Sequence, residues 1–161
     1  MDPVHFTGKE VLDMAVRIEE NGMRFYTDAS KAAKSQQLKD LFSALAEEEA
    51  SHIKTFLELK RALVGNDESA GFDAYIEDAQ QYLKSMADTE VFTNPNAGKE
   101  AARALKGEKE AITLAIGMEK DSLLFYYELE RMIRESDKKI IEALIDQEKE
   151  HVRKLTNLHK V

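Results

Sequence analysis

Residues 38–63 read LKDLFSALAEEEASHIKTFLELKRAL, and residues 141–158 read IEALIDQEKEHVRKLTNL. In each stretch apolar residues recur at alternating spacings of four and three, which is typical of the buried stripe of a helix in a bundle. A glutamate and a histidine three residues later interrupt each stripe. These interruptions are Glu49, His52, Glu148 and His151. Because a buried, unpaired carboxylate costs several kcal/mol, both interruptions require a compensating charge, and a metal ion is the natural candidate.

The second half of the chain repeats the first. The segment 15–26 matches 115–126 at an offset of 100 residues, and the two Glu-x-x-His elements match at an offset of 99. In both segments a glutamate, Glu19 or Glu119, takes an apolar position of the helical stripe. The repeat predicts two helical hairpins related by a pseudo-twofold axis, which would bring the polar core positions to one level. The candidate metal ligands are Glu19, Glu49, His52, Glu119, Glu148 and His151.

Charge and ligand type favour a dinuclear centre. Four carboxylates carry four negative charges and balance two divalent cations, while neutral imidazoles leave that balance unchanged. Ferritin-like di-iron carboxylate proteins use this set: one Glu from each of two helices, and Glu-x-x-His from each of the other two. Mixed carboxylate and imidazole ligands suit iron, although manganese and zinc also accept them. The prediction is an all-α, ferritin-like four-helix bundle with two iron ions; the alternative is a metal-free bundle whose core carboxylates pair with one another and with the histidines.

Two composite motifs resemble those of a known protein family. They are Glu19-x6-Tyr26 with Glu49-x2-His52, and Glu119-x6-Tyr126 with Glu148-x2-His151. The chain is similar, over its four main helices, to the rubrerythrin-like branch of the ferritin-like superfamily. The resemblance implies a non-haem di-iron oxidoreductase that reduces hydrogen peroxide, or dioxygen. The four glutamates would bind and bridge the irons, and the histidines would be terminal ligands. The alternative is a ferritin-like protein that binds and oxidises iron without such turnover.

The sequence departs from classical rubrerythrins in two ways. It contains no Cys, so these residues cannot hold the four-cysteine iron of a rubredoxin domain, and electrons would come from an external donor such as a rubredoxin-like protein. Classical members also carry a further Glu one turn after the third-helix ligand. Here that position is Ser122, beside Asp121, which puts the associated redox-linked ligand exchange in doubt.

Tyr26 and Tyr126 each follow a candidate ligand by seven residues, two helical turns. They could donate hydrogen bonds to the ligand carboxylates. They could equally be core tyrosines whose hydroxyls bond to any acceptor. Glu47 and Glu48 are expected on the solvated side of their helix, and Gly22 is expected to permit close helix approach.

Composition supports one helical domain over residues 1–161. Charged residues make up 34% of the chain and hydrophobic ones 43%, with only two prolines, which favours long amphipathic helices. A partly helical crossover over about 65–106 would join the hairpins. The net charge of −8 argues against a nucleic-acid partner, and no apolar run approaches the ~20 residues of a membrane helix. A cytoplasmic protein without a signal peptide is expected. The sequence leaves a homodimer open.

Overall fold

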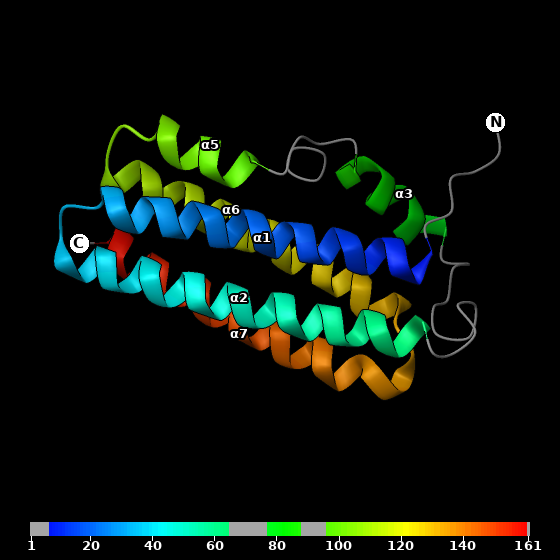
Figure 1. Ribbon diagram of the computed structural model, residues 1–161. Coiled ribbons are helices and arrows are strands. Elements are labelled where there is room, and N and C mark those ends of the chain that lie inside the picture. Colours follow the sequence, from blue (N-terminus) through cyan, green and yellow to red (C-terminus); the bar gives the residue numbers. More distant parts are fainter. Residues whose placement is uncertain (1–6, 65–76, 88–95, 161) are drawn as a thin grey trace.

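The protein is a bundle of four long helices in two antiparallel hairpins (Figure 1). This computed structural model describes residues 7–64, 77–87 and 96–160. The long helices are α1 (Gly8–Ala32), α2 (Gln36–Val64), α6 (Glu108–Met132) and α7 (Lys138–His159). Shorter elements are α3 (Glu77–Ala87), α5 (Ala97–Ala104) and the 3-10 turn η1 (Glu135–Asp137). The predicted all-α, ferritin-like bundle is confirmed.

Two short helices of the crossover lie along the bundle. Within the predicted crossover, α5 packs against α1 and α3 contacts α6. The sequence predicts a helical stretch over 99–106; the observed helix, α5, begins and ends two residues earlier. The sequence of the crossover also predicts a short amphipathic helix from Phe72 to Met86 and a turn at Asn94-Pro95-Asn96. Residues 72–76, 94 and 95 of these predictions lie outside the described residues. Among the described helices, none is long and apolar enough to span a bilayer.

The starts of α1 and α2 are stabilised in different ways, the first by a local capping box and the second by a contact from the other hairpin. The pattern Thr7-x-x-Glu10 predicts a capping box, and it is present: the Thr7 hydroxyl accepts a hydrogen bond from the Glu10 backbone N–H, and the Glu10 carboxylate accepts one from the Thr7 N–H. The start of α2 is held from the other hairpin. Glu108 Oε1 accepts from the backbone N–H groups of Lys34, at 2.6 Å, and Ser35, at 2.9 Å. This contact ties the first loop to the beginning of α6.

A polar layer divides the hydrophobic core into two clusters. On α1, the cluster around Leu12 precedes Glu19 and the cluster around Phe25 follows it; on α2 the order is reversed. The repeated hairpin shows the same division on either side of Glu119 in α6 and of the Glu-x-x-His element in α7. The apolar clusters therefore hold the four helices in register above and below one level, where the candidate ligands lie.

Close helix approach occurs at Gly98 rather than at Gly22. A Cβ atom added to Gly98 would lie 1.9 Å from the backbone oxygen of Asn21, so only glycine fits between α5 and α1. At Gly22 an added Cβ would lie 3.5 Å from Glu49 Cδ, which is an ordinary contact. The interpretation of Gly22 as the point of close approach is wrong. That residue instead faces a candidate ligand carboxyl.

We expect Gly98→Ala to lower the free energy of unfolding by about 1–3 kcal/mol, because backbone atoms cannot move aside as a flexible side chain would. Gly117→Ala is the matched control, since nothing lies within 4 Å of its added Cβ in the middle of α6. That change should stabilise the protein by about 0.5–1 kcal/mol through helix propensity. Urea unfolding of both variants measures the difference. Equal stabilisation by both would contradict the packing of α5 on α1.

Candidate metal centre

All six predicted ligands meet inside the bundle. Each is at most 4% exposed, although four are carboxylates. Spacings of three residues in α2 and α7 put each Glu and His on one face of its helix, one turn apart. The contributing residues are Glu19 from α1, Glu49 and His52 from α2, Glu119 from α6, and Glu148 and His151 from α7.

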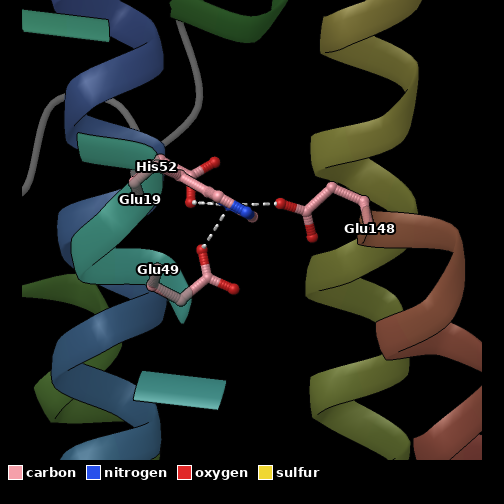
Figure 2. A group of neighbouring side chains, drawn as sticks. All are labelled: Glu19, Glu49, His52 and Glu148. Atoms are coloured by element: carbon pink, nitrogen blue, oxygen red, sulfur yellow. Dashed lines mark hydrogen bonds and ion pairs between the residues drawn. The ribbon is translucent and has the colours of Figure 1, made fainter. Parts of the chain in front are cut away.

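The first half of the centre is built around His52 Nδ1. This nitrogen lies 2.8 Å from Glu148 Oε1, 3.2 Å from Glu19 Oε2 and 3.7 Å from Glu49 Oε2. Figure 2 shows the three carboxylates converging on the same edge of the ring, Glu148 from the opposite side of the bundle. Three acidic oxygens and one imidazole nitrogen thus share one small volume.

The second half repeats this arrangement around His151 Nδ1. Its neighbours are Glu148 Oε2 at 3.0 Å, Glu119 Oε1 at 3.4 Å and Glu49 Oε1 at 3.5 Å. Glu49 and Glu148 therefore each direct one oxygen to each histidine. Two groups of four potential ligands result, and they share these two carboxylates. Such an arrangement could hold two adjacent cations, with Glu49 and Glu148 common to both groups.

Protein atoms alone leave this cluster incompletely satisfied. Of the six buried side-chain atoms without a hydrogen-bond partner among the described residues, four belong to the cluster: Glu19 Oε1, Glu148 Oε1, Glu148 Oε2 and His151 Nδ1. His52 Nδ1 shares a hydrogen bond with Glu19 Oε2, at 3.2 Å. By contrast, His151 Nδ1 and both Glu148 oxygens lie close to charged neighbours without the geometry of a hydrogen bond. Buried polar atoms are almost always partnered. A cation between them would satisfy the carboxylates and the imidazole together, so the residues present fit a metal ion.

Comparisons with known proteins agree with this geometry. The family model for rubrerythrin matches residues 10–159. The chain belongs to the rubrerythrin family. A solved structure from Thermotoga maritima, described as that of a candidate ferritin-like diiron-carboxylate protein, is 30% identical, with a TM-score of 0.69. The match covers 97% of this chain and 96% of that one. A search of curated proteins found no match.

For this member of the rubrerythrin family, the buried cluster could hold two metal ions, and iron is the expected metal. The absence of Cys from the 161 residues means that the rubrerythrin match does not extend to a four-cysteine rubredoxin site within them. The predicted resemblance is confirmed. The assignment of individual ligands stays a prediction, which the proximity and burial of all six side chains support.

The pKa shifts in the cluster separate two kinds of carboxyl. Burial, and then the charge of Glu49, raises the pKa values of Glu19 and Glu119 well above the ordinary range. Burial also acts on Glu148, but the two neighbouring imidazoles outweigh it and lower its pKa. Burial similarly opposes ionisation of Glu49, whose pKa is nevertheless lowered by Glu19 and both histidines.

Both imidazoles retain protons in the metal-free cluster. Burial alone would lower the pKa of each histidine, but the surrounding carboxylates raise it far above the ordinary range. The directions of these pKa shifts favour two imidazolium ions beside ionised Glu49 and Glu148, with Glu19 and Glu119 neutral. The cluster is therefore close to neutral without metal, as it would be with two divalent cations and four ionised carboxylates.

Two further residues contact the outer nitrogens of the histidines. His52 Nε2 lies 2.6 Å from Gln147 Oε1, and His151 Nε2 lies 2.5 Å from Glu48 Oε2. The prediction that Glu48 belongs to the solvated side of its helix is wrong, because this half-buried side chain reaches across to α7. A signal was present in the sequence, since Glu48 and Gln147 occupy equivalent positions of the repeat, each directly before a candidate ligand.

The two tyrosines differ in their contacts. Tyr26 donates a hydrogen bond from its hydroxyl to Glu119 Oε1, and burial, followed by the charge of Glu119, raises the tyrosine pKa. The equivalent Tyr126 is also buried, but its hydroxyl has no hydrogen-bond partner among the described residues. The geometry thus supports the predicted contact with a ligand carboxyl for Tyr26 only.

A cavity of about 330 Å³ opens beside the cluster. Its lining includes Tyr26, Glu49 and Glu119, together with apolar side chains of α5 and α6. Ser122, at the position of the further Glu in classical members, also lines it and donates its hydroxyl hydrogen bond to the Met118 carbonyl. A small oxidant could reach the carboxylates through this space.

We expect metal loading to release about four protons for two divalent ions, two from the imidazoles and two from Glu19 and Glu119. Apparent metal affinity should therefore increase steeply as the pH rises. Calorimetric titration with Co²⁺ in buffers of different ionisation enthalpy measures the number of protons. Release of none, with two ions bound, would contradict the protonated metal-free state.

Proposed function

We propose that this protein is a di-iron-carboxylate oxidoreductase of the rubrerythrin type that reduces hydrogen peroxide with electrons from an external donor. The observation that carries the proposal is the pair of buried four-residue groups that share Glu49 and Glu148. Membership of the rubrerythrin family supports redox chemistry at such a centre. The proposal distinguishes a catalyst from a protein that only stores or oxidises iron.

In this proposal the six buried side chains hold the irons. Glu19 and His52 would serve one position, Glu119 and His151 the other, and Glu49 and Glu148 would be available to both. When bound there, two ferrous ions would supply the two electrons needed to reduce hydrogen peroxide, with two protons, to two molecules of water. Apolar clusters lie on either side of this level of the bundle.

The remaining task of the protein is to deliver protons. Tyr26 holds a proton on the hydroxyl that contacts Glu119, and both residues line the cavity beside the cluster. This hydroxyl can therefore orient Glu119 and pass a proton toward a small molecule in the cavity. The equivalent Tyr126 lies in the opposite apolar cluster and does not line this cavity.

Electrons must arrive from a second molecule, because the 161 residues contain no Cys for an iron–sulphur relay. A rubredoxin-like protein is the expected kind of donor. The net charge of −8 would slow association with an acidic donor at low ionic strength, and added salt should relieve that repulsion.

The bridging assignment predicts unequal effects of two isosteric changes. Glu148→Gln removes a carboxylate shared by both positions and should weaken the binding of both ions. Glu19→Gln removes one from the His52 position alone and should lower the occupancy chiefly of that position, leaving about one ion per chain. Anaerobic loading with Fe²⁺, followed by desalting and metal analysis, gives both stoichiometries. Retention of two tightly bound ions in both variants would overturn the ligand assignment.

Single-turnover kinetics test the reaction. A chain loaded with two ferrous ions should consume about one hydrogen peroxide in a fast phase and then stop until a reductant is added, because two irons store two electrons. Tyr26→Phe should slow this phase, whereas Tyr126→Phe, the matched control, should affect it less. Stopped-flow absorbance follows the oxidation.

The same experiment with dioxygen separates catalysis from iron handling. The reduced protein should react faster with peroxide, and its oxidised centre should return to the ferrous state with a reductant and turn over again. If the reduced centre ignores peroxide but reacts quickly with dioxygen and keeps the ferric product, an iron-binding and iron-oxidising function replaces the proposed one.

A further inference from the structure

The two halves of the centre differ in the groups behind their histidines. Both imidazoles direct Nδ1 into the carboxylate cluster and Nε2 away from it. Behind His151, the partner of Nε2 is the carboxylate of Glu48. Behind His52, it is the side-chain amide of Gln147. The other ligands are matched, since each position has one Glu of its own and shares the two remaining carboxylates. The two positions therefore differ in the charge of the group behind the histidine.

The difference occurs at equivalent sites of the internal repeat. Glu48 precedes Glu49 in α2, Gln147 precedes Glu148 in α7, and 99 residues separate the two, as they separate the histidines. Each side chain crosses from its own helix to the histidine of the other helix. The contacts are therefore reciprocal in geometry and unlike in charge.

A second contact fixes Glu48 in place. Lys154 Nζ lies 3.2 Å from Glu48 Oε1, while Glu48 Oε2 is directed to His151 Nε2. Lys154 and His151 are one turn apart on α7, so a single helical face holds both oxygens of the carboxylate. The residue equivalent to Lys154 in the other half is Thr55, whose hydroxyl donates to the Ser51 carbonyl of its own helix. Thr55 therefore does not hold Gln147 in the way that Lys154 holds Glu48.

The chemistry of an imidazole ligand depends on the partner of its outer nitrogen. When Nδ1 binds a metal, Nε2 carries the hydrogen and donates it outward. A carboxylate accepts this hydrogen bond more strongly than an amide oxygen does, since the acceptor is ionised. It thereby draws positive charge toward the outer side of the ring and makes Nδ1 a better electron donor. It also keeps the ring in the orientation that metal binding needs.

We propose that Glu48 is a positioning residue that makes the two metal positions unequal, so that the position served by His151 binds its divalent ion more tightly than the position served by His52. This inference rests on the two-metal centre of the proposed function. The internal repeat alone would predict two nearly equivalent metal positions, and this inference revises that expectation. The tighter position would fill first and would favour the more highly charged state of its metal.

Stepwise binding of Co²⁺ under anaerobic conditions tests the difference. The parent protein should show two dissociation constants. Glu48→Gln should weaken the tighter step about tenfold and bring the two constants together, in keeping with the effect of replacing a hydrogen-bond partner of a metal-bound histidine. Gln147→Glu should tighten the weaker step instead. Glu47→Gln is the matched control, because it removes the same charge from the neighbouring, exposed position and should leave both constants unchanged.

Variants of the histidines assign the steps to positions. His52→Gln leaves the position served by His151, and His151→Gln leaves the other. When Glu48→Gln is added to His52→Gln, it should weaken binding at the remaining position about tenfold. When it is added to His151→Gln, it should have little effect. In the exchanged variant, Glu48→Gln with Gln147→Glu, the order of filling should reverse. Circular dichroism before each titration shows that the helices are retained.

The outcomes distinguish this inference from the function on which it rests. If two Co²⁺ ions bind and neither Glu48→Gln nor Gln147→Glu changes either constant, Glu48 does not differentiate the positions, and the two-metal centre stands. Equal effects of Glu48→Gln and Glu47→Gln would mean that general surface charge, rather than the hydrogen bond, is responsible. If the parent binds no ion at all, the metal centre itself is wrong.

Discussion

The structure depends on keeping four carboxylates inside an apolar bundle. Isolated carboxylates at such depth are strongly unfavourable, and the protein offers each a nearby imidazole or a second carboxyl that can share or hold a proton. The same atoms can exchange these protons for two cations with little change in total charge. A site of this kind tolerates both the loaded and the metal-free state. Large apolar clusters on either side preserve its shape.

The position of the polar layer explains why the crossover matters to the site. Ligands come from all four long helices, so the hairpins must meet in a fixed register, which the Glu108 contact and the packing of α5 help to maintain. Gly98 brings α5 against the backbone of Asn21, close to the level of Glu19. The short helix thereby forms one wall of the cavity that reaches Glu49 and Glu119. Access to the cluster and support of the bundle are thus provided by the same segment.

Much of this site could be predicted from the sequence, because the buried positions of a helix recur every three or four residues. Glutamate and histidine at apolar positions of four stripes identified six side chains, and all six meet in the structure. Glu48 escaped that reasoning because it lies beside the stripe, where an exposed residue and one that reaches a neighbouring helix have the same periodicity. Gly98 could not be recognised either, since its role depends on how the crossover lies on α1 rather than on local pattern.

The internal repeat and the exceptions to it have different consequences. Repetition supplies two positions with matched ligands, which suits a reaction that takes one electron from each of two irons. Complete symmetry would also leave the two irons alike in affinity and in their ease of oxidation. Glu48 with Lys154, against Gln147 with Thr55, departs from that symmetry without altering any side chain of the inner cluster. Tyr26, which contacts Glu119 and lines the cavity, departs from it on the same side. Both departures concern the half that contains His151 and Glu119, so this half has the imidazole bonded to a carboxylate and the tyrosine that borders the cavity.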